Sequence, residues 1–406
     1  MPFDTNTWLQ SRTATLAQKL QSVGTAALHG GLPSASLKDG ALHLDRLEKT
    51  VPDGADTLVL KLYGDMAPVR ITDVLLEVDH RLGFAEAFSD LRTGAPCRDR
   101  IGLLTVLLAN GVNLGLSKMA DACHGRSFWE LLRIAKWHVR EETYARALAL
   151  IVEAQSALPM ARFWGAGETS SSDGQHFPAG GAGEALNVVN ARYGNEPGLA
   201  AYSHVSDQYA PFATQIIPAT AHEAPYILGG LLQNEAGQRI KVSLIRENWP
   251  DILRLAASMA TGELIPSQIL RKLAAYPRQN SLALALREVG RIERSIFILD
   301  WLSDLDLQRR TQMGLNKGEA HHALKRAISF NRRGEIRDRT SEAQHDRIAG
   351  LNLLAAIIVY WNTWKLGEIV ARLAKAGEAL PSDLLAHVSP LGWEHITLTG
   401  EYHWPA

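Results

Sequence analysis

The chain has 406 residues, of which 46% are hydrophobic, and its formal net charge is −1. This length predicts two or three domains, and the hydrophobic content favours buried cores over wholesale disorder. The balanced charge excludes a global positive field, so any binding of nucleic acid depends on local basic patches. The two cysteines, Cys97 and Cys123, lack the spacing of a zinc site or a disulfide framework, which suits a reducing cytoplasm.

No pattern of a secretory signal opens the chain, because Met1-Pro2-Phe3-Asp4 leads directly into a polar helical pattern. The most apolar stretch, from Leu351 to Trp361, is interrupted by Asn352 and is shorter than the roughly 20 residues that span a bilayer. We therefore expect a cytoplasmic protein with no membrane partner.

The first 160 residues carry mainly helical patterns, with a helical linker region expected at residues 1–60 and a helical domain at residues 61–160. Thr72 or Asp73 is predicted to cap a helix whose apolar residues recur at three- and four-residue spacing. Two longer helices are predicted over residues 98–116 and 127–158.

Between residues 161 and 240 the pattern changes to Gly-rich turns with β-branched and aromatic residues. Phe163–Phe177 is predicted as a strand, and Ala201–Val205 forms a predicted hairpin with Pro211–Ile217. A helix over Thr220–Gln233 is expected next. Three strands and a helix are half of a mixed α/β domain, so the expected fold class is mainly α with an embedded, incomplete α/β domain.

Helical patterns return after residue 240. We expect a helical insertion region at residues 241–310 and further helices at residues 311–370, where a candidate functional glutamate lies. The last part, residues 371–406, is expected to form a C-terminal tail.

The first candidate site is the segment from Thr169 to Gln175, which places Asp173 among three serines and directly before Gly174. A carboxylate on a strand rich in hydroxyl groups can present oxygen atoms to a hard cation such as magnesium. The same residues are also ordinary turn chemistry, so the local pattern leaves both interpretations open.

The second candidate site is a predicted helix that begins near Gly318. Glu319, His322 and Arg326 lie on one face of this helix, at three- and four-residue spacing. A carboxylate, a histidine and an arginine together suit a cation with phosphates. The alternative is a solvated face on which Glu319 stabilises the helix dipole. A zinc site at His321-His322 is not favoured, because the His-Glu-x-x-His spacing is absent.

The third candidate is a basic segment that follows Glu319 and that acidic residues dilute. Its candidate DNA-binding residues are Lys325, Arg326, Arg332, Arg333, Arg337 and Arg339. The chain has no P-loop, no complete dinucleotide fingerprint and no nucleophile elbow, which excludes the enzymes that these motifs define.

Motifs along nearly the whole chain resemble one known family. They are, in chain order, Leu62-Tyr63-Gly64, Arg70-Ile71-Thr72-Asp73, Asn113-Leu114-Gly115-Leu116, Ser170 to Phe177, Ala191 to Gly198, Ser206 to Phe212, Leu315 to Glu319, Gly334 to Arg339, Trp361-Asn362-Thr363 and Ser389 to Ile396. Taken together, the chain resembles the C-terminal part of the replicative DNA transposases of the Tn-three family.

The resemblance implies a bacterial, ribonuclease-H-like catalytic domain embedded in helical domains. In that family two aspartates and a glutamate hold magnesium ions, which activate the nucleophile and stabilise the leaving oxygen during end nicking and strand transfer. Asp173 matches the first aspartate and Glu319 matches the glutamate. The implied partners are DNA, at transposon ends and target, and either a second copy of the chain or a full-length transposase in a mixed assembly.

The second aspartate is where this sequence departs from the family. The family carries it in an Asp-Thr-Gly-Gly-like motif beyond the helix that corresponds to Thr220–Gln233, and this chain has no such motif. The sequence instead passes from Ile240 to Lys241, which resembles a point several tens of residues further on. We also expect the family's N-terminal repeat-reading region to be missing.

Loss of one shared ligand predicts weakened metal binding and impaired catalysis. Asp207, Glu223 and Glu235 are not expected to replace the missing aspartate. Two alternatives to an enzyme stay open. The chain could be a non-catalytic fragment that binds DNA or transposase, or an inert remnant of a decayed transposon.

Overall fold

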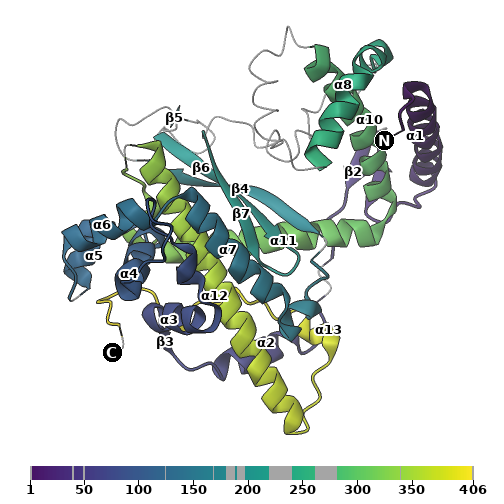
Figure 1. Ribbon diagram of the computed structural model, residues 1–406. Helices are drawn as coiled ribbons and strands as arrows, with labels where there is room; N and C mark the ends of the chain where they lie inside the picture. The colour runs from purple at the N-terminus through teal and green to yellow at the C-terminus, as the bar shows by residue number, and fades with distance from the viewer. Residues whose placement is uncertain are drawn as a thin grey trace. The chain divides into compact units, whose positions relative to one another are not determined.

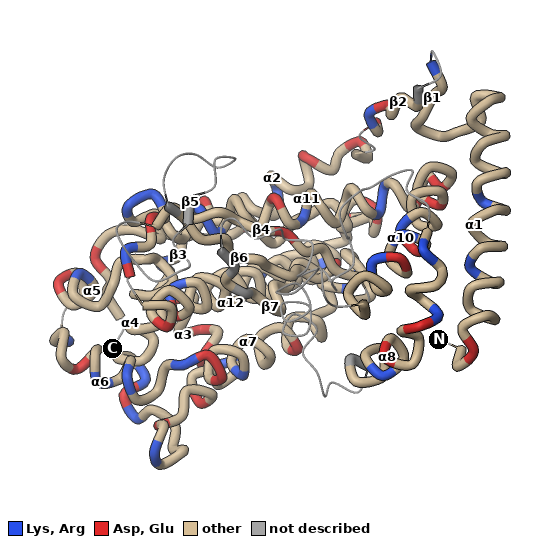
Figure 2. The backbone as a smooth tube through the Cα atoms, turned by 90° about the horizontal axis from the view of Figure 1, so that it is seen from above, with Lys and Arg blue, Asp and Glu red and all other residues tan. Residues whose placement is uncertain are grey.

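The structure, a computed structural model, describes residues 2–38, 41–48, 51–123, 125–167, 169–179, 188–189, 197–218, 240–260, 281–338 and 340–404. The chain divides into two compact units, one of residues 1–49 with 222–313 and the other of residues 50–221 with 314–406. The division falls within a single helix, α11 (Leu305–Ile328). Charged residues of both signs are interspersed along the backbone (Figure 2), in keeping with the small net charge.

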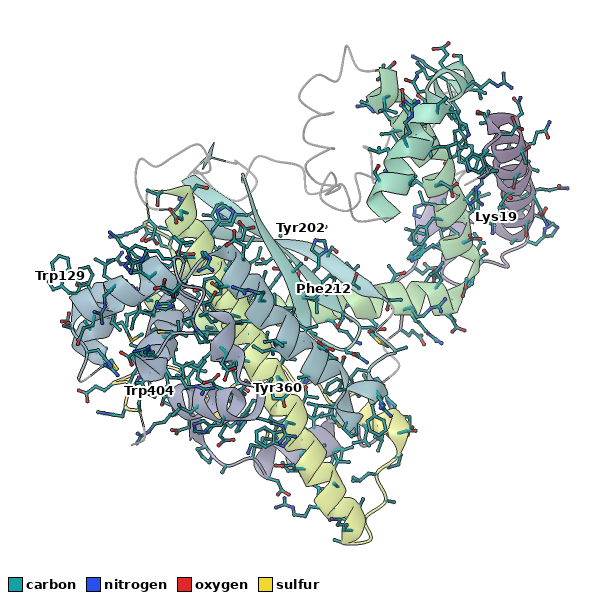
Figure 3. The ribbon with its side chains drawn as sticks, viewed as in Figure 1. Lys19, Trp129, Tyr202, Phe212, Tyr360 and Trp404 are labelled. Carbon is teal, nitrogen blue, oxygen red and sulfur yellow. The ribbon has the colours of Figure 1, made fainter. Side chains whose placement is uncertain are left out.

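The first unit is built on α1 (Thr5–Leu28), α8 (Val242–Ala260) and α10 (Ser281–Ser303), with a hairpin of β1 (Ala35–Lys38) and β2 (Ala41–Leu44). Asp4 starts α1, because its side chain accepts a hydrogen bond from the backbone N–H of Thr7 at 2.8 Å. Trp8 and Trp249 pack with ring centroids 5.1 Å apart. Lys19, labelled in Figure 3, pairs with Asp300 and so joins α1 to α10.

The second unit contains most of the helices. They are α2 (Ala55–Gly64), α3 (Ile71–Leu82), α4 (Arg100–Gly111), α5 (Leu116–Ala122), α6 (Phe128–His138), α7 (Glu141–Ser156), α12 (Ser341–Lys375) and α13 (Ser382–Leu385). Short 3-10 turns lie at Phe84–Ala87, Pro159–Phe163 and Asn331–Gly334.

Helix α12 is the centre of this unit's core. It contacts α2, α3, α4 and α7 and runs through the middle of these helices in Figure 1. From Gly350 to Thr363 every residue of α12 is buried, including Tyr360, which is labelled in Figure 3. A helix that is apolar on all sides is typical of a core position.

By length and composition, α12 could also cross a membrane, but 72% of its most apolar window is buried inside the structure, as in the core helix of a soluble protein. Among the described residues, α4 and α5 pass the same test only if the pair, bent by 120°, is counted as one span.

Helices α4 and α12 approach closely at a pair of glycines. A Cβ atom added to Gly350 would lie 2.8 Å from the Cβ of Asn110 and 3.0 Å from the backbone nitrogen of Gly111. A Cβ added to Gly111 would lie 2.2 Å from a methyl carbon of Leu354. The two backbones can therefore touch here only because neither position carries a side chain.

The four-stranded sheet of this unit is antiparallel. Strand β6 (Pro197–Ser206) pairs with β4 (Ser170–Pro178) on one side and β7 (Pro211–Pro218) on the other, and β5 (Val188–Val189) pairs with the start of β6. The pairing of β6 with β7 confirms the predicted hairpin. Tyr202 on β6 and Phe212 on β7 mark these strands in Figure 3.

The C-terminal segment packs back onto the start of the unit. Strand β8 (Ile396–Thr397) pairs in parallel with β3 (Val69–Arg70). The side-chain amide of Asn362 donates to the carbonyl oxygens of Pro390 at 2.7 Å and Gly392 at 2.8 Å. The expected C-terminal tail is therefore partly built into the fold.

Several predicted boundaries differ from the structure. The helix predicted over residues 127–158 is two helices, because Val139 and Arg140 adopt extended backbone conformations. Helix α3 begins at Ile71, so neither Thr72 nor Asp73 is its N-cap, and Arg70 takes that position. The strand predicted from Phe163 starts later, at Ser170. The helix predicted over Thr220–Gln233 lies outside the described residues. The protein is mainly helical, as expected.

Candidate metal centre and basic loop

Strand β4 places Asp173 at the first part of the candidate site. Asp173 lies opposite Ser203 of β6 in the antiparallel register, and about a third of its side chain, 35%, is exposed. The backbone N–H of Gly174 donates to its carboxylate at 2.8 Å. Burial nevertheless raises the pKa of Asp173, because the loss of solvent disfavours the charged form.

Helix α11 brings the second part of the site against β4. A Cβ added to Gly314 would lie 3.6 Å from the Cβ of Ser171, and one added to Gly318 would lie 3.5 Å from the hydroxyl oxygen of Ser171. These two glycines are four residues apart and therefore lie on the same helix face. With no side chains between them, the next residue, Glu319, and then His322 reach the neighbourhood of Asp173.

Asp173, Glu319 and His322 form a cluster whose possible ligand atoms all lie within 4.8 Å of one another. Nδ1 of His322 is 3.8 Å from a carboxylate oxygen of Asp173 and 3.9 Å from one of Glu319. Burial, followed by the nearby charge of Lys325, lowers the pKa of His322 to about 4. The imidazole is therefore neutral near pH 7, and these contacts are neither ion pairs nor hydrogen bonds.

Two carboxylates and a neutral imidazole that converge without bonding one another are a donor set that fits a divalent cation. Glu319 is 69% exposed on its side chain, so the cluster is open to solvent on that side. We call Asp173, Glu319 and His322 the metal cluster.

Beneath the metal cluster, α11 presents a line of buried polar residues at four-residue spacing. Lys317 donates to the backbone carbonyl oxygens of Trp164 and Asp207, and Nε2 of His321 lies 2.7 Å from the carbonyl oxygen of Tyr209. Lys325 donates to the hydroxyl of Ser203 at 2.7 Å. These bonds attach α11 to the sheet and to the turn that follows β6.

Burial lowers the pKa of each of these residues, to about 8 for Lys317, about 3 for His321 and about 7 for Lys325. Only 2% of Lys325 is exposed. Lys325 was predicted to contact DNA, but in the structure its ammonium group is buried and bonded to Ser203 of the sheet, so it does not belong to the exposed basic surface. The spacing of residues 317, 321 and 325 places them on one face of the helix, but nothing in the local sequence shows that this face is buried.

Asp207 does not join the metal cluster. Its carboxylate accepts hydrogen bonds from the backbone N–H of Gly167 at 3.0 Å and from the hydroxyl of Thr169 at 3.1 Å, in the turn between β6 and β7. Glu223 and Glu235, the other carboxylates considered as replacements, lie outside the described residues.

The other basic residues predicted to bind DNA are exposed where the structure describes them. Arg326 lies in the last turn of α11, and Arg332 and Arg333 lie in the 3-10 turn that follows. Arg337 is exposed but is paired with Glu335 at 2.9 Å. Arg339 lies outside the described residues.

Arg332 and Arg333 have left-handed backbone conformations, with φ of 53° and 56°. Such conformations are uncommon for residues with a side chain and persist where the surroundings hold them. Here Asn331 donates to the carbonyl oxygen of Asn113 at 2.7 Å, and Asn113 donates to that of Glu335 at 2.8 Å. We call the segment Asn331–Gly334 the basic loop.

The fold and the cluster define a class: a mainly helical protein in which a strand-borne aspartate and a helix-borne glutamate meet at a site suited to a divalent cation. The profile of the family described as "Tn3 transposase DDE domain" matches residues 73–241 and 235–402. The chain belongs to the Tn3 transposase DDE domain family. This family implies the use of a divalent metal.

Individual relatives of this chain are transposases of the same kind. The chain is 41% identical over 454 residues to the transposase of transposon Tn501 from Pseudomonas aeruginosa, covering 98% of this chain and 46% of the relative. It is 40% identical to the transposase of Tn21 from Escherichia coli and 36% identical to that of Tn1546 from Enterococcus faecium, with the same coverage of both chains. The chain spans about half the length of the curated relatives it matches.

The comparisons also locate an internal difference. The alignment with the Tn501 transposase runs over 454 positions, whereas this chain has 406 residues, so at least 48 positions (454 less 406) have no counterpart here. The two segments of this chain that match the family profile overlap at residues 235–241. The junction predicted from the sequence, at Ile240 and Lys241, falls at the same place.

Proposed function

We propose that this chain carries the metal-binding and DNA-contacting region of a DNA transposase in which the catalytic site is incomplete. The observation that carries the proposal is the meeting of Asp173 and Glu319, which come from a strand and a helix 146 residues apart in the sequence. The sheet beneath them would then be the first half of a ribonuclease-H-like domain. We also propose that the chain is organised in the six regions predicted from the sequence.

Asp173 and Glu319 would hold the divalent cation, which the family resemblance implies is magnesium. When bound, such an ion lowers the pKa of a nucleophilic oxygen and stabilises a leaving oxygen during phosphoryl transfer. The two carboxylates supply the negative charge that a cation needs, and the half-burial of Asp173 places it at the edge of solvent. Glu319 faces solvent, where a DNA backbone could approach.

The segment that would carry the second aspartate has no counterpart here, so two close cations would lack a shared ligand. The electrostatic repulsion between two divalent ions is then insufficiently neutralised. We propose that the chain retains binding of one cation and loses efficient nicking and strand transfer.

A nicking assay tests this proposal. With supercoiled and transposon-end DNA and either Mg²⁺ or Mn²⁺, we expect no nicking above background from a sample shown to be folded by circular dichroism. Asp173→Ala and Glu319→Ala serve as matched controls. Nicking that both substitutions abolish would mean that another carboxylate completes the site, and the proposed impairment would be wrong.

The basic loop favours a second candidate function, a non-catalytic fragment that binds DNA. Arg332 and Arg333 are exposed on a backbone held by Asn113 and Asn331, so they are presented at a defined place. Binding of DNA by arginines releases counterions and therefore weakens as salt rises. As such a fragment, the chain would assemble with a second copy of itself or with full-length transposase in a bacterial cytoplasm.

The double substitution Arg332→Ala and Arg333→Ala is expected to weaken DNA binding alike on all sequences. The slope of log K against log salt should fall in magnitude by about two, since each lost phosphate contact removes about one. Fluorescence anisotropy at several salt concentrations measures this slope. Arg372→Ala is the matched control, because Arg372 is exposed but already paired with Asp65. An unchanged slope in the double variant would exclude the basic loop from the DNA contact.

A further inference from the structure

We infer that His322 is a direct ligand of the cation in the metal cluster, so that the site is a single mixed site of two carboxylates and one imidazole. Such a site favours first-row transition-metal ions over magnesium. The inference deepens the proposed function and rests on the proposal that Asp173 and Glu319 hold a cation.

The burial and direction of the His322 side chain carry the inference. Only 7% of this side chain is exposed, and its ring makes no hydrogen bond within the part of the chain that the structure describes. Its Nδ1 atom faces the two carboxylates at 3.8 and 3.9 Å. The side chain is thus well buried and directed at the two carboxylates, and a cation shared with Asp173 and Glu319 is the partner that this geometry fits.

The neighbouring histidine shows what a purely structural role looks like on the same helix. His321 is also buried, but its Nε2 lies 2.7 Å from the backbone carbonyl oxygen of Tyr209 and so helps to attach α11 to the turn after β6. His322 has no such bond among the described residues. The two adjacent imidazoles therefore have different partners, and only His322 faces the carboxylates.

The surroundings hold His322 in this position. The side-chain amide of Gln175, on the same strand as Asp173, donates to the backbone carbonyl oxygen of His322 at 3.3 Å. One helical turn before, Gly318 lets α11 approach Ser171 and Asp173. A ligand that is already oriented loses little freedom when the ion binds, which favours binding.

The composition of the cluster decides which ion it prefers. Magnesium takes oxygen ligands almost exclusively, whereas imidazole suits the later first-row metals, and affinity for a given site rises from Mn²⁺ through Co²⁺ to Ni²⁺. With three protein donors converging on one point, the described residues fit one ion rather than two. The cluster should therefore bind Mn²⁺ more tightly than Mg²⁺.

Mn²⁺ is the probe for the test, because its electron spin reports both binding and the nature of the ligands. The full chain is titrated with Mn²⁺ by EPR, and the bound ion is examined by pulsed EPR for coupling to a ¹⁴N nucleus. We expect a ¹⁴N coupling in the unsubstituted chain that disappears in His322→Asn. The affinity for Mn²⁺ should fall by about tenfold or more, since even residues that only orient a ligand contribute that much.

His204→Asn is the matched control. His204 lies on β6 near the site, but its ring contacts the hydroxyl of Ser172 at 2.6 Å and is not in the metal cluster. This variant should keep both the coupling and the affinity. Circular dichroism of both variants shows that they are folded.

The outcomes separate the two levels of the argument. Binding of Mn²⁺ that depends on Asp173 and Glu319 but shows no ¹⁴N coupling overturns the role of His322. A ¹⁴N coupling that survives in His322→Asn does the same. Both results leave the proposed cation site standing. No binding of Mn²⁺, or binding unchanged in Asp173→Ala and Glu319→Ala, overturns both.

Discussion

Replacing Lys325 with methionine is expected to stabilise the protein by about 1–4 kcal/mol at pH 6, the range seen when buried charges are replaced by apolar groups. The ammonium group of Lys325 is buried, with a pKa lowered to about 7, and it donates a hydrogen bond to the neutral hydroxyl of Ser203. Methionine has a similar length and needs no solvation.

The effect should depend on pH in a defined direction. The pKa of Lys325 is about 7 in the folded protein and 10.5 in its reference state. Below pH 7 the group is charged in both states, and the full cost of burying the charge lowers stability. Between pH 7 and about 10.5 the unfolded chain holds the proton and the folded protein does not, so stability increases with pH. The gain from Lys325→Met should therefore be largest at pH 6 and shrink toward pH 10.

Urea unfolding of both proteins at pH 6, 8 and 9.5 measures this difference. Lys375→Met is the matched control, because Lys375 is an exposed lysine near the end of α12 and its replacement should change stability by no more than about 0.5 kcal/mol. A methionine variant that is less stable than the parent at pH 6 would show that the bond to Ser203 outweighs the cost of burial.

Replacing Gly350 with alanine is expected to lower stability by about 1–3 kcal/mol, as overpacking of a tight core commonly does. The new Cβ would meet the Cβ of Asn110 at 2.8 Å and the backbone nitrogen of Gly111 at 3.0 Å. A backbone atom cannot rotate away like a flexible side chain, so α4 and α12 must move apart. Both helices lie in the main core of the second unit.

Gly64→Ala is the control for this substitution. Gly64 ends α2, and a Cβ there would meet nothing within 4 Å, so alanine should be neutral or stabilising by about 0.4–1 kcal/mol. Thermal unfolding followed by circular dichroism compares the two variants. Equal midpoints for Gly350→Ala and the parent protein would contradict the close contact between α4 and α12.

The sequence predicts helices well where apolar residues repeat over many positions. Helix α12 lies mostly within the helical region expected at residues 311–370, and it begins at Ser341, where Thr340 accepts a hydrogen bond as its N-cap. The break at Val139 and Arg140 could not be predicted in the same way, because it lies between two segments that each continue a helical pattern. There, Arg140 bonds to the backbone carbonyl oxygen of Ser89, a partner 51 residues away.

The metal cluster was predictable only in part. Local patterns indicated Asp173 and the face of Glu319 and His322 separately, and the family resemblance joined the two carboxylates. No local pattern says which face of α11 turns to the sheet, and Lys325 was therefore assigned to the surface. Its true position depends on Ser203, which lies on another element.

The parallel pair of β3 and β8 has a consequence for how the protein is made. Val69 and Ile396 are register partners although they are 327 residues apart in the sequence (396 less 69). At about 5–20 residues per second, on the order of tens of seconds separate their synthesis on the ribosome. The first helices of this unit must wait that long with apolar surface uncovered, so folding of the nascent chain should depend on chaperones that shield it until β8 has been made.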